Sequence, residues 1–180
     1  GSRVPREAAR SLLQDLAGPI GESTRVVLYA PTWRDGGADP GVPTRTEWEM
    51  IARWLEQRDA VLLVRAHPLG LGDYAAGPQM SGRIRMLGSR ELVDVTPVLP
   101  GIDSLVTDYS SIAYDYALTD GPIVFFARDV ELYARKRGLY ENYRVFSDDR
   151  SVSTWSHVLE HLDAVGDDDV LGLRLAQHTT

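Results

Sequence analysis

The sequence has no cysteine, no long apolar run and only one lysine, Lys136. Without cysteine, the 180-residue chain can form neither a disulfide nor a thiolate zinc site. No stretch approaches the roughly 20 consecutive apolar residues that span a bilayer. The 19 basic and 26 acidic residues give a net charge of −7, which argues against a general nucleic-acid binder, because phosphate contacts require a basic face. Any anion-binding site must therefore be local.

Three common catalytic signatures are also missing. No Gly-x-Gly-x-x-Gly follows a strand-like run, and there is no Gly-Lys-Ser or Gly-Lys-Thr loop, which argues against NAD-dependent enzymes and P-loop ATPases. The Gly-x-Ser-x-Gly elbow of serine hydrolases is absent. Carboxylates at metal-binding spacing, such as Asp-x-Asp, occur only in the acidic run at 167–169. We therefore expect a reaction that requires neither a metal nor a cofactor.

What remains is an ordinary globular composition, with 43% apolar and 25% charged residues. A chain of this length buries roughly 70% of its unfolded surface, so one domain with its own core is expected. The opening Gly1-Ser2 pair is typical of a cloning scar, and we expect the chain to be a domain of a longer protein. We predict a folded domain over residues 3–166 and a flexible acidic end over 167–180.

Apolar periodicity predicts alternating strands and helices. Unbroken apolar runs, typical of parallel strands covered on both faces, occupy Arg25 to Ala30 and Ala60 to Arg65. The other predicted strands are Ile84 to Leu87, Leu105 to Thr107 and Ile123 to Phe126. Helical spacing predicts helices over Pro5 to Ala17, about Thr44 to Gln57, Ser111 to Leu118 and Val152 to Leu162. This order predicts an α/β fold with a Rossmann-like, doubly wound parallel sheet.

Ligands of such sheets bind outside the carboxyl ends of the strands, so the segments that follow the strands form the candidate site. Three of them carry polar residues: Tyr29 to Arg34, Arg65 to Pro68 and Thr107 to Ser111. We expect these segments to meet at one rim. In the third, hydroxyls and unpaired backbone N–H groups at a helix start suit a pyrophosphate. An alternative interpretation is that Asp108 or Ser110 only caps the helix. The sequence leaves open whether this segment is a pyrophosphate site or a helix cap.

A histidine, a tryptophan and a basic segment extend this rim. His67, which precedes Pro68, is placed to act as a general base or, when protonated, as a clamp on a phosphoryl group; alternatively, its ring only bonds a backbone carbonyl. Trp33 and Arg34 suit a base and a phosphate, although Trp33 could equally plug the sheet edge. The segment Arg135 to Arg137 closes over an anionic donor, faces an anionic lipid headgroup or is only a solvated helix end.

Taken in order, these segments resemble those of a known family. The matching stretches, which lie between about Val26 and Tyr143, are Tyr29 to Arg34, Arg65 to Pro68, Asp103 to Tyr116, Gly121 to Phe126 and Asp129 to Tyr140. They resemble the C-terminal half of the CDP-glycerol glycerophosphotransferases of teichoic acid synthesis. Because several motifs recur in the same order, the resemblance is far more specific than any one of them.

The resemblance implies a GT-B architecture, in which a C-terminal Rossmann-like domain binds the CDP-linked donor and a separate N-terminal domain presents the acceptor. This chain resembles the donor domain alone. In the family, the histidine that matches His67 is proposed as catalytic. The residues that match the donor pyrophosphate site are Thr107, Asp108, Ser110 and Ser111, with Arg137 in a nearby Arg-Gly motif. The predicted donor-binding set is completed by Pro31, Thr32, Trp33, Arg34 and Arg65.

The sequence departs from the family pattern in two places. The family's other important histidine lies in a Trp-His-Gly segment that precedes this region, and it is absent here, so we expect the isolated chain to be inactive. Where family members carry a Pro-Gly-Pro stretch, this sequence reads Tyr143 to Ser151. The C-terminal closure of the donor pocket is therefore expected to differ.

The resemblance implies that the longer protein transfers glycerol phosphate, or a related polyol phosphate, from CDP-glycerol to a hydroxyl of a wall or capsule polymer and releases CMP. CDP-glycerol would be the donor substrate, and no cofactor or nucleic acid would take part. We expect the longer protein to be cytoplasmic and peripheral at the inner face of the cell membrane. Two alternatives remain, namely a GT-B glycosyltransferase that uses a nucleotide sugar and a non-catalytic nucleotide-binding module.

Overall fold

The computed structural model describes residues 5–32, 34, 38–66, 72–130, 147 and 150–164. The expectations for the Gly1-Ser2 scar, Trp33, His67, the segment from Arg135 to Arg137 and the acidic end at 167–180 lie outside these residues. None of the helices within the described ranges combines the length and the apolar character that crossing a bilayer requires.

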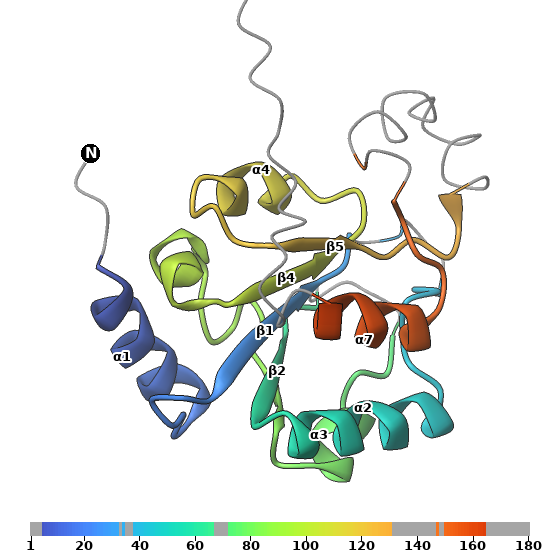
Figure 1. The fold of residues 1–180 in the computed structure, drawn as a ribbon, viewed down its shortest axis with the longest axis horizontal. Helices are drawn as coiled ribbons and strands as arrows, with labels where there is room; N and C mark the ends of the chain where they lie inside the picture. The colour runs from blue at the N-terminus through green and yellow to red at the C-terminus, as the bar shows by residue number, and fades with distance from the viewer. Residues whose placement is uncertain are drawn as a thin grey trace, which may run out of the picture.

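Within these ranges the strands form one five-stranded parallel sheet (Figure 1). The strands are β1 (Arg25–Ala30), β2 (Ala60–Val64), β3 (Ile84–Met86), β4 (Ser104–Thr107) and β5 (Ile123–Phe125). Their order is β3-β2-β1-β4-β5, so the chain winds outward from β1 to β3 and then returns to the other side of β1. The winding direction reverses between β1 and β4, and open parallel sheets bind ligands at such a switch point.

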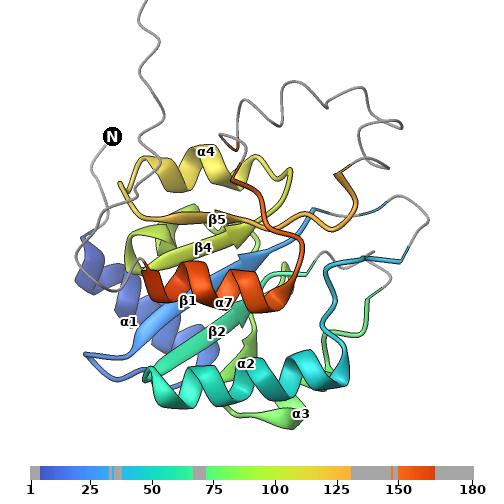
Figure 2. The same ribbon diagram turned by 45° about the vertical axis from the view of Figure 1, so that its right-hand side comes forward.

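Helices cover both faces of the sheet (Figure 2). They are α1 (Arg6–Ala17), α2 (Arg45–Gln57), α3 (Ala76–Met80), η1 (Thr96–Gly101), α4 (Ile112–Ala117) and α7 (Trp155–Ala164). Along β1, Val27 and Tyr29 pack with α2 and α7, whereas Val26 and Leu28 pack with α1, η1 and α4. Burial on both faces explains why the strands read as unbroken apolar runs. The predicted doubly wound parallel α/β fold is confirmed.

Two short helices have no counterpart in the sequence prediction. The α3 sequence is Ala-Gly-Pro-Gln-Met, and η1 contains two prolines, so both segments carry residues that normally interrupt helices. Tertiary packing holds them in place. A side chain at Gly101 of η1 would meet Leu13 and the backbone of Ala9 at 3.0–3.1 Å, so this glycine allows η1 to lie directly on α1.

The last helix begins later than the predicted Val152. Val152 instead forms a parallel bridge with Phe126, in which its amide donates to the Phe125 carbonyl at 2.8 Å. The Thr154 hydroxyl then accepts from the His157 amide at 3.2 Å and caps α7, which starts at Trp155. The apolar residue at 152 belongs to the sheet edge, and periodicity alone assigned it to the helix.

Asp163 fastens α7 to α2. Its carboxylate accepts from the Trp54 indole N–H at 2.9 Å and from Nε and Nη2 of Arg58 at 2.8 and 2.9 Å. The hydrogen bond from Arg58 holds the pKa of the Asp163 carboxyl below its ordinary value of 3.8. Because the side chain is 37% exposed, solvent screens much of this interaction.

We expect Asp163→Asn to lower the free energy of unfolding at pH 7 by about 1 kcal/mol or less. A depressed carboxyl pKa stabilises the fold above the unfolded-state value, and this contribution is lost as pH falls through the folded-state value. The difference in the free energy of unfolding between wild type and variant should therefore become smaller as the pH falls from 7 to below about 4. Urea denaturation across this range measures it, with Asp15→Asn on the exposed face of α1 as the control. A gap that does not change with pH would contradict the expectation.

Candidate functional site

A cleft of about 570 Å³ opens at the carboxyl edge of the sheet, around the switch point between β1 and β4. Each wall comes from a segment that follows a strand. The lining residues are Ala30, Pro31, Thr32, Arg65, Ala66, Ser89, Val93, Asp94, Val95, Thr96, Tyr109, Ser110, Ser111, Ile112 and Asp115. The volume is that of a small-molecule site. Five predicted donor-binding residues, Pro31, Thr32, Arg65, Ser110 and Ser111, therefore share one cleft.

The polar groups of the cleft are mainly hydroxyls. They belong to Thr32, Ser89, Thr96, Tyr109, Ser110 and Ser111. Those of Thr32 and Tyr109 already donate within the protein, to Asp108 at 2.6 Å and to Asp129 at 3.3 Å. Hydroxyls can donate to phosphate oxygens and can also accept from sugar or polyol hydroxyls. The cleft can therefore bind a polar, oxygen-rich ligand.

Two carboxylates also line the cleft. The Thr96 amide donates to Asp94 at 2.9 Å and lowers the pKa of that carboxyl. Asp115 lies in the first turn of α4. Sequence reasoning missed Ser89, Asp94 and Thr96 as site residues, because they follow the edge strand β3 without any recognisable motif. The strand-end rule, applied to the predicted strand at Ile84, was the available signal.

The helix after β4 is shorter than predicted. It runs from Ile112 to Ala117, and its first cap residue, Ser111, makes no side-chain capping bond. The Ser110 hydroxyl accepts from the Ile112 amide at a long 3.5 Å. A six-residue helix has a small dipole, so hydroxyls and local amides, rather than the helix as a whole, are what this segment offers an anion.

Asp108 does not cap that helix. Its carboxylate, 4% exposed, instead accepts from the amide and hydroxyl of Thr32 at 2.8 and 2.6 Å, from the Tyr109 amide at 2.7 Å and from Nη2 of Arg34 at 2.8 Å. These bonds join the segment after β4 to the segment after β1. The prediction had Asp108 at the donor pyrophosphate, whereas both carboxylate oxygens here are bonded within the protein.

Arg34 connects Asp108 to a third segment. Its Nε and Nη2 donate to the carboxylate of Asp129, just after β5, at 2.8 and 3.0 Å, and its Nη1 donates to the Thr32 carbonyl at 2.7 Å. Burial alone would lower the pKa of the guanidinium, but the bonds and charges of Asp129 and Asp108 outweigh it and raise that pKa. We call Arg34, Asp108 and Asp129 the Arg34 cluster.

Two other predicted residues also direct their polar groups into the protein. The buried Thr107 hydroxyl donates to the Ala30 carbonyl at 2.7 Å and ties β4 to β1. The Arg65 guanidinium donates to the carbonyls of Leu92 and Val93 at 2.8 and 3.0 Å, and burial lowers its pKa. Arg65 thus holds the loop after β3 as one wall of the cleft.

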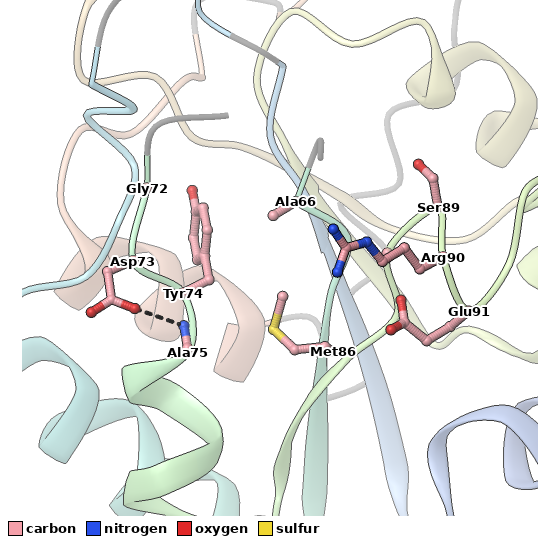
Figure 3. A pocket seen from close by; sticks show the side chains of 10 residues that line it. Ala66, Gly72, Asp73, Tyr74, Ala75, Met86, Ser89, Arg90 and Glu91 are labelled. Carbon is pink, nitrogen blue, oxygen red and sulfur yellow. Dashed lines mark hydrogen bonds between the residues drawn. The ribbon is translucent and has the colours of Figure 1, made fainter. Parts of the chain in front are cut away.

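A side pocket of about 340 Å³ adjoins the cleft (Figure 3). It shares Ala66 and Ser89 with the cleft, and Tyr74 and Arg90 flank it from opposite sides, with Met86 between them. The Tyr74 hydroxyl donates to Asp39 at 2.5 Å. The sequence prediction did not include this pocket. His67, the predicted catalytic residue, directly follows Ala66 and, like Trp33 and Arg137, lies outside the described residues.

Comparisons with known proteins agree with the resemblance seen in the sequence. The family model for CDP-glycerol:poly(glycerophosphate) glycerophosphotransferase matches residues 6–174. Teichoic acid ribitol-phosphate polymerase TarL of Staphylococcus aureus is 30% identical over 152 residues, which cover 81% of this chain and 26% of TarL. Teichoic acid glycerol-phosphate primase of Bacillus subtilis is 34% identical over 119 residues, 66% of this chain and 30% of the primase. The chain thus spans between a quarter and a third of these relatives.

A solved structure has a similar fold. The wall teichoic acid polymerase TagF superposes with a TM-score of 0.56 and 23% identity, over 89% of this chain and 42% of TagF. A TagF variant soaked with CDPG superposes with a TM-score of 0.53 and 23% identity, over 90% of this chain and 42% of that chain. Since the family model covers nearly all of the sequence, from the start of α1 to beyond the end of α7, the chain belongs to the CDP-glycerol:poly(glycerophosphate) glycerophosphotransferase family.

Proposed function

We propose that this chain is the donor-binding domain of a longer transferase, which moves glycerol phosphate or a related polyol phosphate from a CDP-linked donor to a hydroxyl of a wall polymer. The observation that carries the proposal is the hydroxyl-lined cleft at the switch point, built from the segments that resemble this family. The relatives include both glycerol-phosphate and ribitol-phosphate enzymes, so the proposal covers both polyols.

The reaction that we propose is a displacement at phosphorus. An acceptor hydroxyl oxygen attacks the phosphorus that bears the polyol, and the bond from that phosphorus to the bridging oxygen breaks. CMP leaves with the electron pair, and the acceptor loses its proton to a base. Negative charge grows on the bridging and equatorial oxygens, where positioned donors stabilise it. The hydroxyls of Ser110 and Ser111 are our candidate donors, together with Arg137, which the family resemblance adds.

We expect the Ser110→Ala, Ser111→Ala double variant to bind CDP at least about tenfold more weakly than wild type, because two hydroxyl donors to a charged ligand are lost. Isothermal titration calorimetry of the 180-residue chain measures this. The control is Ser156→Ala on the exposed face of α7, where the hydroxyl donates to Glu160. Unchanged CDP affinity in the double variant, or tighter binding of a UDP-sugar than of CDP-glycerol by wild type, would contradict the proposal.

We further propose His67 as the catalytic residue, supported by the family resemblance and by its place directly after Ala66, which lines both the cleft and the side pocket. A neutral imidazole there takes the acceptor proton, whereas an imidazolium stabilises the phosphate. The two roles predict opposite changes of activity with pH. As pH rises through about 6.5, a required base gains activity and a required imidazolium loses it.

His67→Ala should lower turnover by the longer protein about a hundredfold or more, the usual contribution of a general acid or base. It should also remove one limb from the pH profile of kcat/KM, the rising limb for a base and the falling limb for a clamp. CMP release from CDP-glycerol with acceptor present provides the assay. His157→Ala on the exposed face of α7 is the matched control. A His67→Ala variant with unaltered turnover would refute the assignment.

Three features of the longer protein complete the proposal. A separate N-terminal domain supplies the acceptor and the family's other histidine, as in a GT-B enzyme, so the isolated chain binds the donor without turning it over. No cofactor is required. The family's lipid-linked acceptors support a cytoplasmic protein that lies peripherally at the inner face of the membrane.

A further inference from the structure

The Arg34 cluster lies directly behind the cleft and joins the ends of three strands. Arg34 follows β1, Asp108 follows β4 and Asp129 follows β5. All three side chains are largely buried, with 10%, 4% and 13% of their surfaces exposed. Their bonds link positions 74 and 95 residues apart in the sequence. The cluster therefore fixes the relative positions of three segments beyond the points where their strands end.

The cluster reaches the cleft only through its neighbours. Thr32 and Tyr109 line the cleft, and the amides of both donate to Asp108. Arg34 also holds the Thr32 carbonyl and lies over the Tyr109 ring, with 5.1 Å between the guanidinium carbon and the ring centroid. Ser110 follows Tyr109 directly. A shift within the cluster would thus move the cleft wall on both sides of the switch point.

The charge of the cluster is of the wrong sign for holding a diphosphate. Two carboxylates and one guanidinium carry a net charge of −1, and the guanidinium is bonded to both carboxylates. A carboxylate repels a phosphate, and an arginine already bonded to two carboxylates has little net positive field to offer. The contribution of the cluster to a bound anion must therefore come through geometry.

We propose that Arg34, Asp108 and Asp129 are positioning residues, which hold Thr32 and the Tyr109-Ser110 segment at the spacing that receives the diphosphate without touching it themselves. The inference rests on the proposed function, because it takes a CDP-linked donor as the ligand of the cleft. It assigns Arg34 and Asp108 a different role from the direct donor contact that the sequence predicted.

The Asp129→Asn variant separates the effect of geometry on CDP affinity from the effect of charge, because the two change that affinity in opposite directions. Removing a negative charge near an anion site strengthens anion binding if charge alone matters. Loss of the fork between Arg34 and Asp129 weakens it instead. We expect the variant to bind CDP about tenfold more weakly than wild type in calorimetry. The control is Glu56→Gln, which makes the same charge change on the exposed face of α2 and should leave CDP affinity unchanged. Equal or tighter CDP binding by Asp129→Asn would overturn the inference.

Two further variants guard against a purely structural explanation. Arg34→Lys keeps the charge but cannot reach Asp108, Asp129 and the Thr32 carbonyl at once, so it should weaken CDP binding as much as Asp129→Asn. The Arg34→Lys, Asp129→Asn double variant should then bind CDP no more weakly than whichever single variant binds CDP less tightly, because both substitutions act through one cluster. Asp129→Glu keeps the charge and only displaces the carboxylate by one methylene, so it serves if Asp129→Asn does not fold. Additive losses, or wild-type CDP affinity in Asp129→Glu, would overturn the inference.

Amide hydrogen exchange tests the cluster without any ligand. In Arg34→Lys, exchange at Thr32 and Tyr109 should rise at least about tenfold relative to the central Leu28 amide of β1. Unchanged exchange at both sites would overturn the positioning role. If wild type binds no CDP, the proposed function fails, and the exchange result still decides whether the cluster positions the rim.

Discussion

A sheet that is apolar on both faces confines the polar chemistry of the fold to the ends of its strands. The two ends are used differently in this protein. At the amino ends, Asp103 accepts from Arg10 and from the Val26 amide, while Arg25 donates to Ser104 and to the Leu162 carbonyl. These charged groups close that edge with bonds inside the protein. At the carboxyl ends, hydroxyls face a cleft, so this edge is the one that can receive a ligand.

The open edge needs its own means of support, because most of the residues that form it lie in loops between strands and helices. The structure supplies that support through long-range bonds to side chains. The Thr107 hydroxyl bonds β4 to β1, and Arg65 donates hydrogen bonds to backbone carbonyls of the loop after β3. The Arg34 cluster joins the segments after β1, β4 and β5. The geometry of the hydroxyls that face the cleft thus depends on the polar residues behind them.

The parts of the fold that the sequence predicts are those with a local signal. The unbroken runs at β1 and β2 reflect burial on both faces, and the strand-end rule places Pro31, Thr32, Ser110 and Ser111 at one rim. The helices α3 and η1 have no such signal, because glycine and proline interrupt their pattern and tertiary packing holds them. Likewise, Val152 fits a helical period as well as it fits the sheet edge.

The hydrogen-bond partners of Arg34 and Asp108 could not be predicted, for a related reason. The residue types are those that bind nucleotides, and the sequence shows nothing of the partner. Asp129 lies 95 residues from Arg34, and only the sheet topology brings them together. Residue type therefore predicted that this edge carries the polar chemistry. Which groups face a ligand and which face each other depends on long-range pairing that a single sequence does not contain.

Burying three charges behind a cleft is not an efficient way to stabilise a fold. Desolvation of a carboxylate or a guanidinium offsets most of the attraction between them, and apolar side chains of similar volume often do as well. The benefit lies in geometry: a planar guanidinium with several fixed donors accepts few arrangements of its partners, whereas apolar contacts tolerate many. In the Arg34 cluster each carboxylate is held by directed bonds from Arg34, and Asp108 passes that constraint on to the Thr32 and Tyr109 amides. An edge whose ligand-facing groups are mainly hydroxyls depends on such a constraint, because hydroxyls bind an anion well only when their positions are set in advance.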